Sequence, residues 1–124
     1  MRFNRYTQKS QEAVMAAQES ARSQDHAEVR PVHLLSALLD KEQSVIQSLL
    51  GKLKIDPSKL ESAVRKELDR LPRATGSQIG ASRALLDVFA DAQKQADRLK
   101  DEFVSTEHLL LGLINKGELT EVFR

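Results

Sequence analysis

Three histidines are the first residues to consider for chemistry, because imidazole binds metals and transfers protons near neutral pH. They are His26, His33 and His108. A metal site needs three or four ligands, and no carboxylate cluster stands at i, i+4 spacing from His33 or His108. The chain has no Cys, which removes thiolate sites and a cysteine nucleophile. We therefore interpret His33 and His108 as partly buried residues near helix starts, and we expect no metal.

Acidic side chains gather at Asp101, Glu102 and Glu107. A catalytic pair would have to flank a pocket and hold two different pKa values, because one group acts as acid and the other as base. Glu107 equally suits the first turn of a helix, where negative charge is favourable. Without further information these residues are best interpreted as a solvated turn.

The segment from Gly112 to Glu118 begins like a phosphate-binding loop. Glu118 stands where that loop needs Lys, and no strand precedes the segment. A phosphate cradle needs both the basic residue and the strand–loop–helix geometry. We therefore expect neither nucleotide binding nor enzymatic activity from this chain.

Charge and aromatic content argue against nucleic acid as a partner. The net charge is +1, from 19 Lys and Arg against 18 Asp and Glu, and aromatic residues make up 4% of the chain. The basic residues of 52–73 are interleaved with acidic ones, as on a solvated helix face. Single-strand binding normally also uses aromatic stacking. Phe89, on an apolar helix face, leaves two interpretations open, core packing or an exposed anchor for a peptide.

Apolar spacing of three and four residues places helices nearly everywhere, so the predicted class is all-α. No run of about 18 apolar residues exists, so we expect no membrane partner and a cytoplasmic location. The expected helices begin after Thr7, at Pro31, at Ser44, at Asp56-Pro57, after Ser82 and after Ser105, with Pro72 ending the fourth and 72–81 connecting to the fifth.

The two halves of the sequence repeat at a shift of 75 residues, which aligns Thr7 with Ser82. Residues 7–41 then meet 82–116 without a gap, with nine identities in 35, including His33-Leu34-Leu35 against His108-Leu109-Leu110. Because caps and core positions stay in phase, we predict a pseudo-two-fold helical bundle whose halves cover each other.

One domain is expected over 1–124. Its first repeat spans about 5–71, its connecting loop 72–81, and its second repeat about 82–124. The second repeat lacks counterparts of 50–71. It is therefore expected to be truncated at its C-terminal end, in a fragment of a longer protein that starts at Met1.

The opening Met-Arg-Phe-Asn-Arg-Tyr-Thr and the segments 31–39, 68–72 and 105–111 together resemble the Clp amino-terminal (Clp repeat) domain. The resemblance covers essentially the whole chain and is closest to the ClpB branch, the AAA+ disaggregases. The Arg-Leu-Pro turn at 70–72 favours that branch over ClpA and ClpC. The ClpV domain of type VI secretion shares a similar Leu-Pro turn.

The resemblance implies a substrate-binding module of a hexameric, ATP-driven disaggregase. Such a module contacts unfolded or aggregated polypeptides, helps pass them to the central pore, and acts with the Hsp70-type chaperone system. ClpA- and ClpC-like domains dock adaptor proteins instead, which is the alternative. ATP and Mg²⁺ would bind elsewhere in the whole protein, this domain would hold no cofactor, and the isolated domain would be a monomer.

The resemblance also implies a peptide groove. Its polar positions correspond to Thr7, Asp101 and Glu107, and its apolar positions to Phe89, Asp91 and His108. Asp91 and His108 stand where leucine is typical, so the expected groove is more polar or shifted. Lys54 stands where Gly usually ends the third helix, so strain in a left-handed conformation is expected there.

Overall fold

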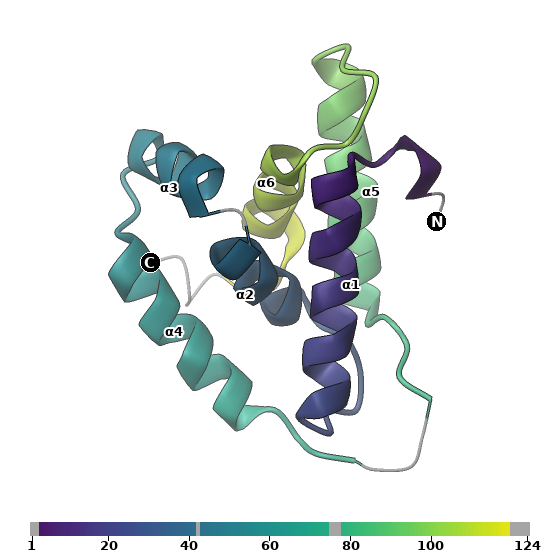
Figure 1. Ribbon diagram of the computed structural model, residues 1–124, viewed down its shortest axis with the longest axis vertical. Coiled ribbons are helices and arrows are strands. Elements are labelled where there is room, and N and C mark those ends of the chain that lie inside the picture. The colour runs from purple at the N-terminus through teal and green to yellow at the C-terminus, as the bar shows by residue number, and fades with distance from the viewer. Residues whose placement is uncertain (1–2, 42, 75–77, 120–124) are drawn as a thin grey trace.

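The computed structural model describes residues 3–41, 43–74 and 78–119 (Figure 1). Within them the chain forms a short 3-10 helix and six α-helices, with isolated bridges as the only β pairing, so the all-α prediction is confirmed. Positions 75–77 of the expected loop and 120–124 of the expected second repeat lie outside the described residues. The elements are η1 (Phe3–Arg5), α1 (Gln8–Ser23), α2 (Pro31–Lys41), α3 (Gln43–Lys52), α4 (Pro57–Arg70), α5 (Arg83–Arg98) and α6 (Thr106–Lys116).

Side-chain caps start the longest helices where the sequence predicts them. Thr7 Oγ1 accepts the N–H of Ser10, and Ser82 Oγ accepts that of Leu85, both at 3.1 Å. Such bonds satisfy amides that have no partner inside the helix. The predicted start of the third helix is wrong by one residue: α3 begins at Gln43, so Ser44 lies inside its first turn and does not cap it.

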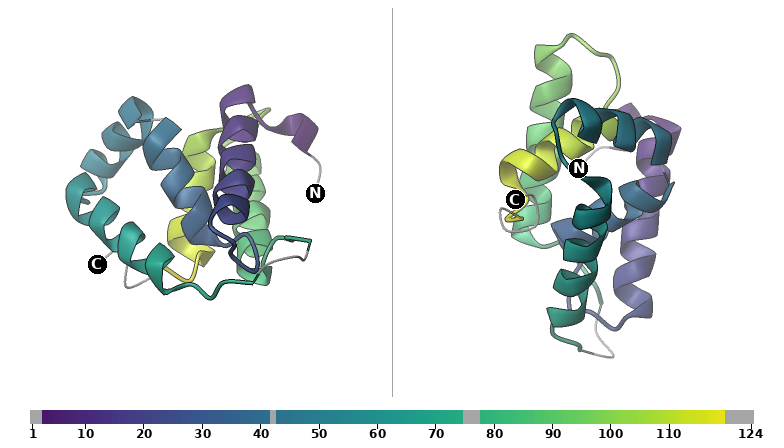
Figure 2. Two further views of the ribbon diagram at one scale, coloured as in Figure 1. Left: turned by 60° about the horizontal axis from the view of Figure 1, so that its bottom comes forward. Right: turned by 90° about the vertical axis from the view of Figure 1, so that its left-hand side faces the viewer.

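Helices α2 and α6 form the centre of the molecule, and α1 and α5 run in opposite directions beside them (Figures 1 and 2). Helix α1 packs on α2, α5 packs on α6, and α2 and α6 contact each other, while α3 and α4 pack against α2. The centre consists of fully buried leucines, which supply the main apolar contribution to folding. They are Leu34, Leu35, Leu38, Leu109, Leu110 and Leu113.

Backbone hydrogen bonds repeat at the same 75-residue shift as the sequence. In each half, one valine pairs with an extended segment that leads into a long helix of the other repeat. The bonds are Val104 N to Arg5 O (2.8 Å), Thr7 N to Val104 O (3.0 Å), Val29 N to Gly80 O (2.9 Å) and Ser82 N to Val29 O (2.9 Å). The predicted pseudo-two-fold relation is therefore present in the backbone itself.

Lys54 adopts the left-handed conformation expected of it, with φ of 60°. It follows the last turn of α3, where the N–H of Ile55 bonds back to the carbonyl of Leu50 at 2.9 Å. Only Gly occupies this conformation without a Cβ penalty. Lys54 therefore stores strain at the end of α3.

We predict that Lys54→Gly raises the free energy of unfolding by about 0.5–1 kcal/mol, because relief of strain exceeds the added entropy of the unfolded chain. Urea denaturation measures the change. Gln47→Gly is the control: Gln47 is an exposed residue in the interior of α3, so this variant should lower stability by a similar amount. A Lys54→Gly protein no more stable than the wild type would show that the strain is absent.

Candidate functional site

An open apolar pocket of about 260 Å³ lies between α1 and α5. We call it the α1–α5 pocket; its lining residues are Val14, Ala17, Gln18, Val29, Leu34, Ile79, Ala81, Leu85, Leu86 and Phe89. Leu86 at its edge is 41% exposed. A larger hollow of about 420 Å³ includes Asp40, Glu61 and Arg65 in its lining, so it is far more polar. Of the two, only the α1–α5 pocket offers the apolar lining typical of ligand sites.

Phe89 forms part of the floor of the α1–α5 pocket and is only 3% exposed. Its ring packs edge-on against that of Tyr6, with centroids 6.3 Å apart and planes at 74°. Burial raises the pKa of Tyr6 to about 12. Of the two interpretations of Phe89, core packing is therefore the right one, and the buried ring also lines the pocket.

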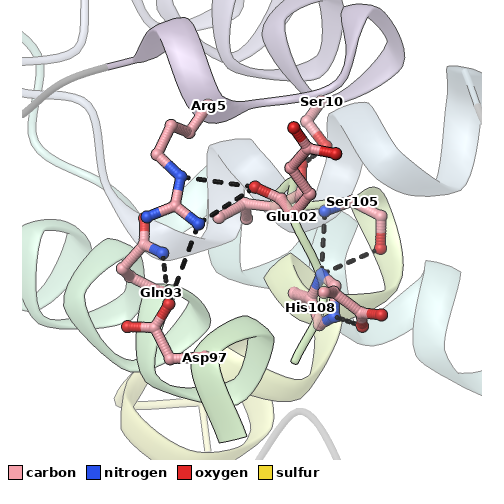
Figure 3. A network of polar contacts seen from close by, with 9 residues as sticks. Arg5, Ser10, Gln93, Asp97, Glu102, Ser105 and His108 are labelled. Carbon is pink, nitrogen blue, oxygen red and sulfur yellow. Dashed lines mark hydrogen bonds and ion pairs between the residues drawn. The ribbon is translucent and has the colours of Figure 1, made fainter. Parts of the chain in front are cut away.

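A polar corner forms where α5 meets α6 (Figure 3). We call it the α5–α6 corner and define it as Thr7, Asp101, Ser105 and His108. His108 Nδ1 accepts the N–H of Ser105 at 2.8 Å, so the ring proton sits on Nε2 and is donated to Asp101 Oδ2 at 2.9 Å. Thr7 reaches the same corner through its N–H, which bonds to the carbonyl of Val104. Of the predicted site residues, Asp101 and His108 are therefore bonded to each other, while the Thr7 side chain caps α1 through the N–H of Ser10.

The α5–α6 corner resembles a nucleophile–histidine–acid arrangement, because Ser105 Oγ also lies 3.0 Å from His108 Nδ1. A general base must accept the proton of the nucleophile's hydroxyl. Here the backbone N–H of Ser105 already occupies that nitrogen's lone pair. The imidazole therefore acts as the return partner of a helix cap rather than as a base.

Arg5 is bonded to the turn between α5 and α6 at Glu102 (Figure 3). Its guanidinium donates to the carbonyl of Glu102 at 3.0 and 3.3 Å and lies 4.0 Å from Asp97. Phe103 remains about half exposed beside it. The turn between α5 and α6 thus carries the carboxylates of Asp101 and Glu102 and the exposed ring of Phe103, and Arg5 is bonded to it.

Glu107 lies apart from these groups. It is exposed and lines a shallow hollow with Val45, Leu49 and Lys52 of α3. Although it stands next to His108 in sequence, it therefore faces α3 rather than the α1–α5 pocket.

Within the described ranges no group of three or more His, Asp or Glu side chains is placed to hold a metal ion. In the same residues no helix is both long and apolar enough to cross a membrane.

Residues 5–124 match the family model of the Clp repeat (R) N-terminal domain. The chain belongs to the Clp N-terminal domain family. It is 40% identical to the chaperone protein ClpB of Rhodopirellula baltica over 113 residues, which is 90% of this chain and 13% of that protein.

Two solved structures share the fold of this Clp N-terminal domain. The Hsp104 N-terminal domain from Candida albicans has a TM-score of 0.84 and 22% identity, covering 95% of this chain and 79% of that one. A complex of a ClpV N-domain with VipB peptide has a TM-score of 0.75 and 16% identity, covering 98% and 72%.

In this Clp N-terminal domain Asp91 does not line the α1–α5 pocket that Phe89 lines. Two residues along an α-helix turn the side chain by about 200°, so the two side chains leave α5 on opposite sides. Asp91 Oδ2 accepts instead from Asn115 Nδ2 of α6 at 3.1 Å. His108, the other position where leucine is typical, is buried in the α5–α6 corner, so it also contributes no open apolar surface.

A buried histidine pair is a feature of the Clp N-terminal domain that we did not predict. His33 Nδ1 accepts the N–H of Arg30 at 2.9 Å, so its Nε2 carries the proton and donates it to His26 Nδ1 at 2.7 Å. Burial, with the neighbouring His26, lowers the pKa of His33 to about 4. Burial, with the charge of Arg73, lowers the pKa of His26.

The repeat could have revealed this pair, because it aligns His26 and His33 with Asp101 and His108. The two helix starts use the same Nδ1 cap, and only the second partner differs. In the first half the partner of the capping histidine is neutral, and in the second half it is a carboxylate.

Proposed function

We propose that this domain binds substrate for an ATP-dependent disaggregase of the ClpB type. It takes exposed apolar segments of unfolded or aggregated polypeptides and helps pass them to the AAA+ pore. The observation that carries the proposal is the open α1–α5 pocket, whose apolar lining and half-exposed Leu86 have no covering element among the described residues. Its relatives named ClpB support the choice of branch.

The size of the pocket suits weak, reversible binding. At about 260 Å³ it takes one or two side chains, which is below the range of drug-sized sites. The free energy from so small an area is largely offset by the lost freedom of the bound segment. A substrate that is held briefly can leave toward the pore, which a tightly held one could not.

This chain spans about 13–15% of the length of the curated relatives that it matches. The rest of the proposed activity is assigned to the whole protein. We propose that the whole protein is a cytoplasmic homohexamer that binds ATP and Mg²⁺ outside this domain and acts with Hsp70-type chaperones. Within this arrangement the domain itself binds no cofactor and no nucleic acid.

Docking of an adaptor protein is the second candidate. The related ClpV N-domain that was solved with a VipB peptide favours it, because that peptide comes from one defined protein. The two functions differ in their partners: a disaggregase domain binds many unfolded chains, and an adaptor-docking domain binds one folded partner. A panel of several unfolded proteins distinguishes them, since only the first function predicts binding to most of the panel.

We predict that Leu86→Asp weakens binding to reduced, carboxymethylated α-lactalbumin at least tenfold, because it places a charge at the edge of the apolar pocket. Fluorescence anisotropy with the labelled protein measures the affinity. Leu53→Asp is the matched control, since Leu53 is also 41% exposed but does not line this pocket. Equal affinities of the two variants would overturn the assignment of the site.

A further inference from the structure

The two bridges that the repeat relates, Tyr6 with Val104 and Ala81 with Val29, lie at two equivalent ends of the molecule that are filled by side chains of different size. At one end Tyr6 follows η1, pairs with Val104 and is buried. At the other end Ala81 pairs with Val29 in the same parallel manner, and Ala81 is exposed. The 75-residue shift aligns Ala81 with Tyr6 and Val29 with Val104. One end therefore holds a phenol ring where the other has only a methyl group.

The surroundings of the missing ring are present at the Ala81 end. The ring of Tyr6 packs against Phe89, and the repeat aligns Phe89 with Val14. Val14 and Val29 both line the α1–α5 pocket, which opens beside Ala81. The open space is therefore the counterpart of the site that Tyr6 fills.

The open end is also the more apolar one. It has Leu85 and Leu86 at the positions where the filled end has Ser10 and Gln11. The hydroxyl of Ser10 donates a hydrogen bond to the carbonyl of Val104 at 2.9 Å. Moving an apolar group from water into such an apolar space lowers the free energy of the system. A cavity of about 150 Å³ already accepts benzene, and this one has about 260 Å³.

We propose that the α1–α5 pocket takes one aromatic side chain, Phe or Tyr, from an extended segment of a bound polypeptide, and that the small side chain of Ala81 determines this specificity. The occupant lies where the chain's own Tyr6 lies at the equivalent position. Phe89, which lines the pocket, offers it a ring to contact as Phe89 does for Tyr6. This inference rests on the proposed function, since it names the residue type that the substrate-binding site prefers.

The first test uses three unstructured 15-residue peptides that differ only in a central Phe, Leu or Ala. They are titrated into the ¹⁵N-labelled domain, and the amide shifts of Ala81 and Leu86 report occupancy. The Phe peptide should bind at least threefold more tightly than the Leu peptide and at least tenfold more tightly than the Ala peptide. Equal binding of the Phe and Leu peptides would overturn the inference.

The second test fills the pocket from within. Ala81→Phe supplies the ring at the position equivalent to Tyr6, so the variant should stay folded and bind the Phe peptide at least tenfold more weakly. Ala74→Phe adds the same ring at an exposed alanine outside the pocket and should bind like the wild type. A folded Ala81→Phe variant with unchanged affinity would overturn the inference, and the peptide series decides the question if that variant unfolds.

The two levels of the proposal fail in different ways. If carboxymethylated α-lactalbumin and the other unfolded proteins do not bind at all, the proposed function falls and the inference falls with it. If they bind and Leu86→Asp weakens them without any preference for aromatic residues, only the inference is overturned.

Discussion

Gly112→Ala is expected to lower the free energy of unfolding by about 2–3 kcal/mol, which is in the range measured for overpacked cores. Gly112 lies on α6 where this helix crosses α5. A Cβ at this position would lie 2.7 Å from the carbonyl oxygen of Val88 and 3.3 Å from the amide nitrogen of Ala92. Both atoms belong to the backbone, so the two helices themselves would have to separate.

Gly51→Ala is the matched control for this prediction. Gly51 lies in α3, and a Cβ there would meet no atom within 4 Å. Because Ala favours a helix over Gly, this variant should be more stable by up to about 1 kcal/mol. Chemical denaturation of both variants measures the difference. Equal changes in the two proteins, or a Gly112→Ala protein as stable as the wild type, would show that α5 and α6 are not packed as described.

Acidification from pH 7 to pH 4 is expected to destabilise the wild type by about 2–3 kcal/mol more than His33→Gln. The folded-state pKa of His33 is about 4, while the ordinary value is 6.5. Between these values the unfolded chain binds a proton that the folded one does not. The contribution of His33 to stability is therefore fully present above pH 6.5 and is lost as the pH falls toward 4.

The lowered pKa of His26 acts in the same direction, and its causes are burial and the charge of Arg73, opposed by Asp25. Protonation of His33 also conflicts with the cap, because Nδ1 already accepts the N–H of Arg30. Glutamine at the third position of a helix makes the same return bond without titrating, so His33→Gln keeps the cap. Urea denaturation at half-unit steps of pH measures both proteins, and parallel pH profiles would contradict the role of His33.

Local signals in the sequence were sufficient for most of the fold. Thr7, Ser82 and Pro57 mark helix starts because their capping chemistry depends only on neighbouring residues. The repeat then predicted that the two halves pack against each other with a pseudo-two-fold relation. The start of α3 was misplaced because Ser44 has the residue type of a cap while lying inside the helix.

The candidate site was predicted only in part. Asp101 and His108 are bonded to each other because the turn and the helix cap between α5 and α6 bring them together, while Thr7 reaches this turn only through its backbone N–H. Glu107 and Asp91 do not join them, since the direction in which a helical side chain points depends on its phase around the axis. These two positions were transferred from the family pattern, which carries no information about that phase in this chain.

The α1–α5 pocket could not be predicted from the sequence. The repeat aligns Ala81 with Tyr6, but the difference in side-chain size acquires meaning only when both residues are seen paired with equivalent valines. An unfilled space is the absence of a side chain, so no single residue marks it. The aligned positions that differ most in volume between the halves are therefore the ones to inspect in such a repeat.

The central claim, that unfolded polypeptide binds between α1 and α5, is tested most directly by mapping amide shifts of the ¹⁵N-labelled domain on addition of carboxymethylated α-lactalbumin. We predict that the largest shifts occur around the α1–α5 pocket, at Val14, Ala81 and Leu86, with smaller ones at the α5–α6 corner. Shifts confined to α3 and α4, with the α1–α5 pocket unperturbed at saturation, would contradict the account.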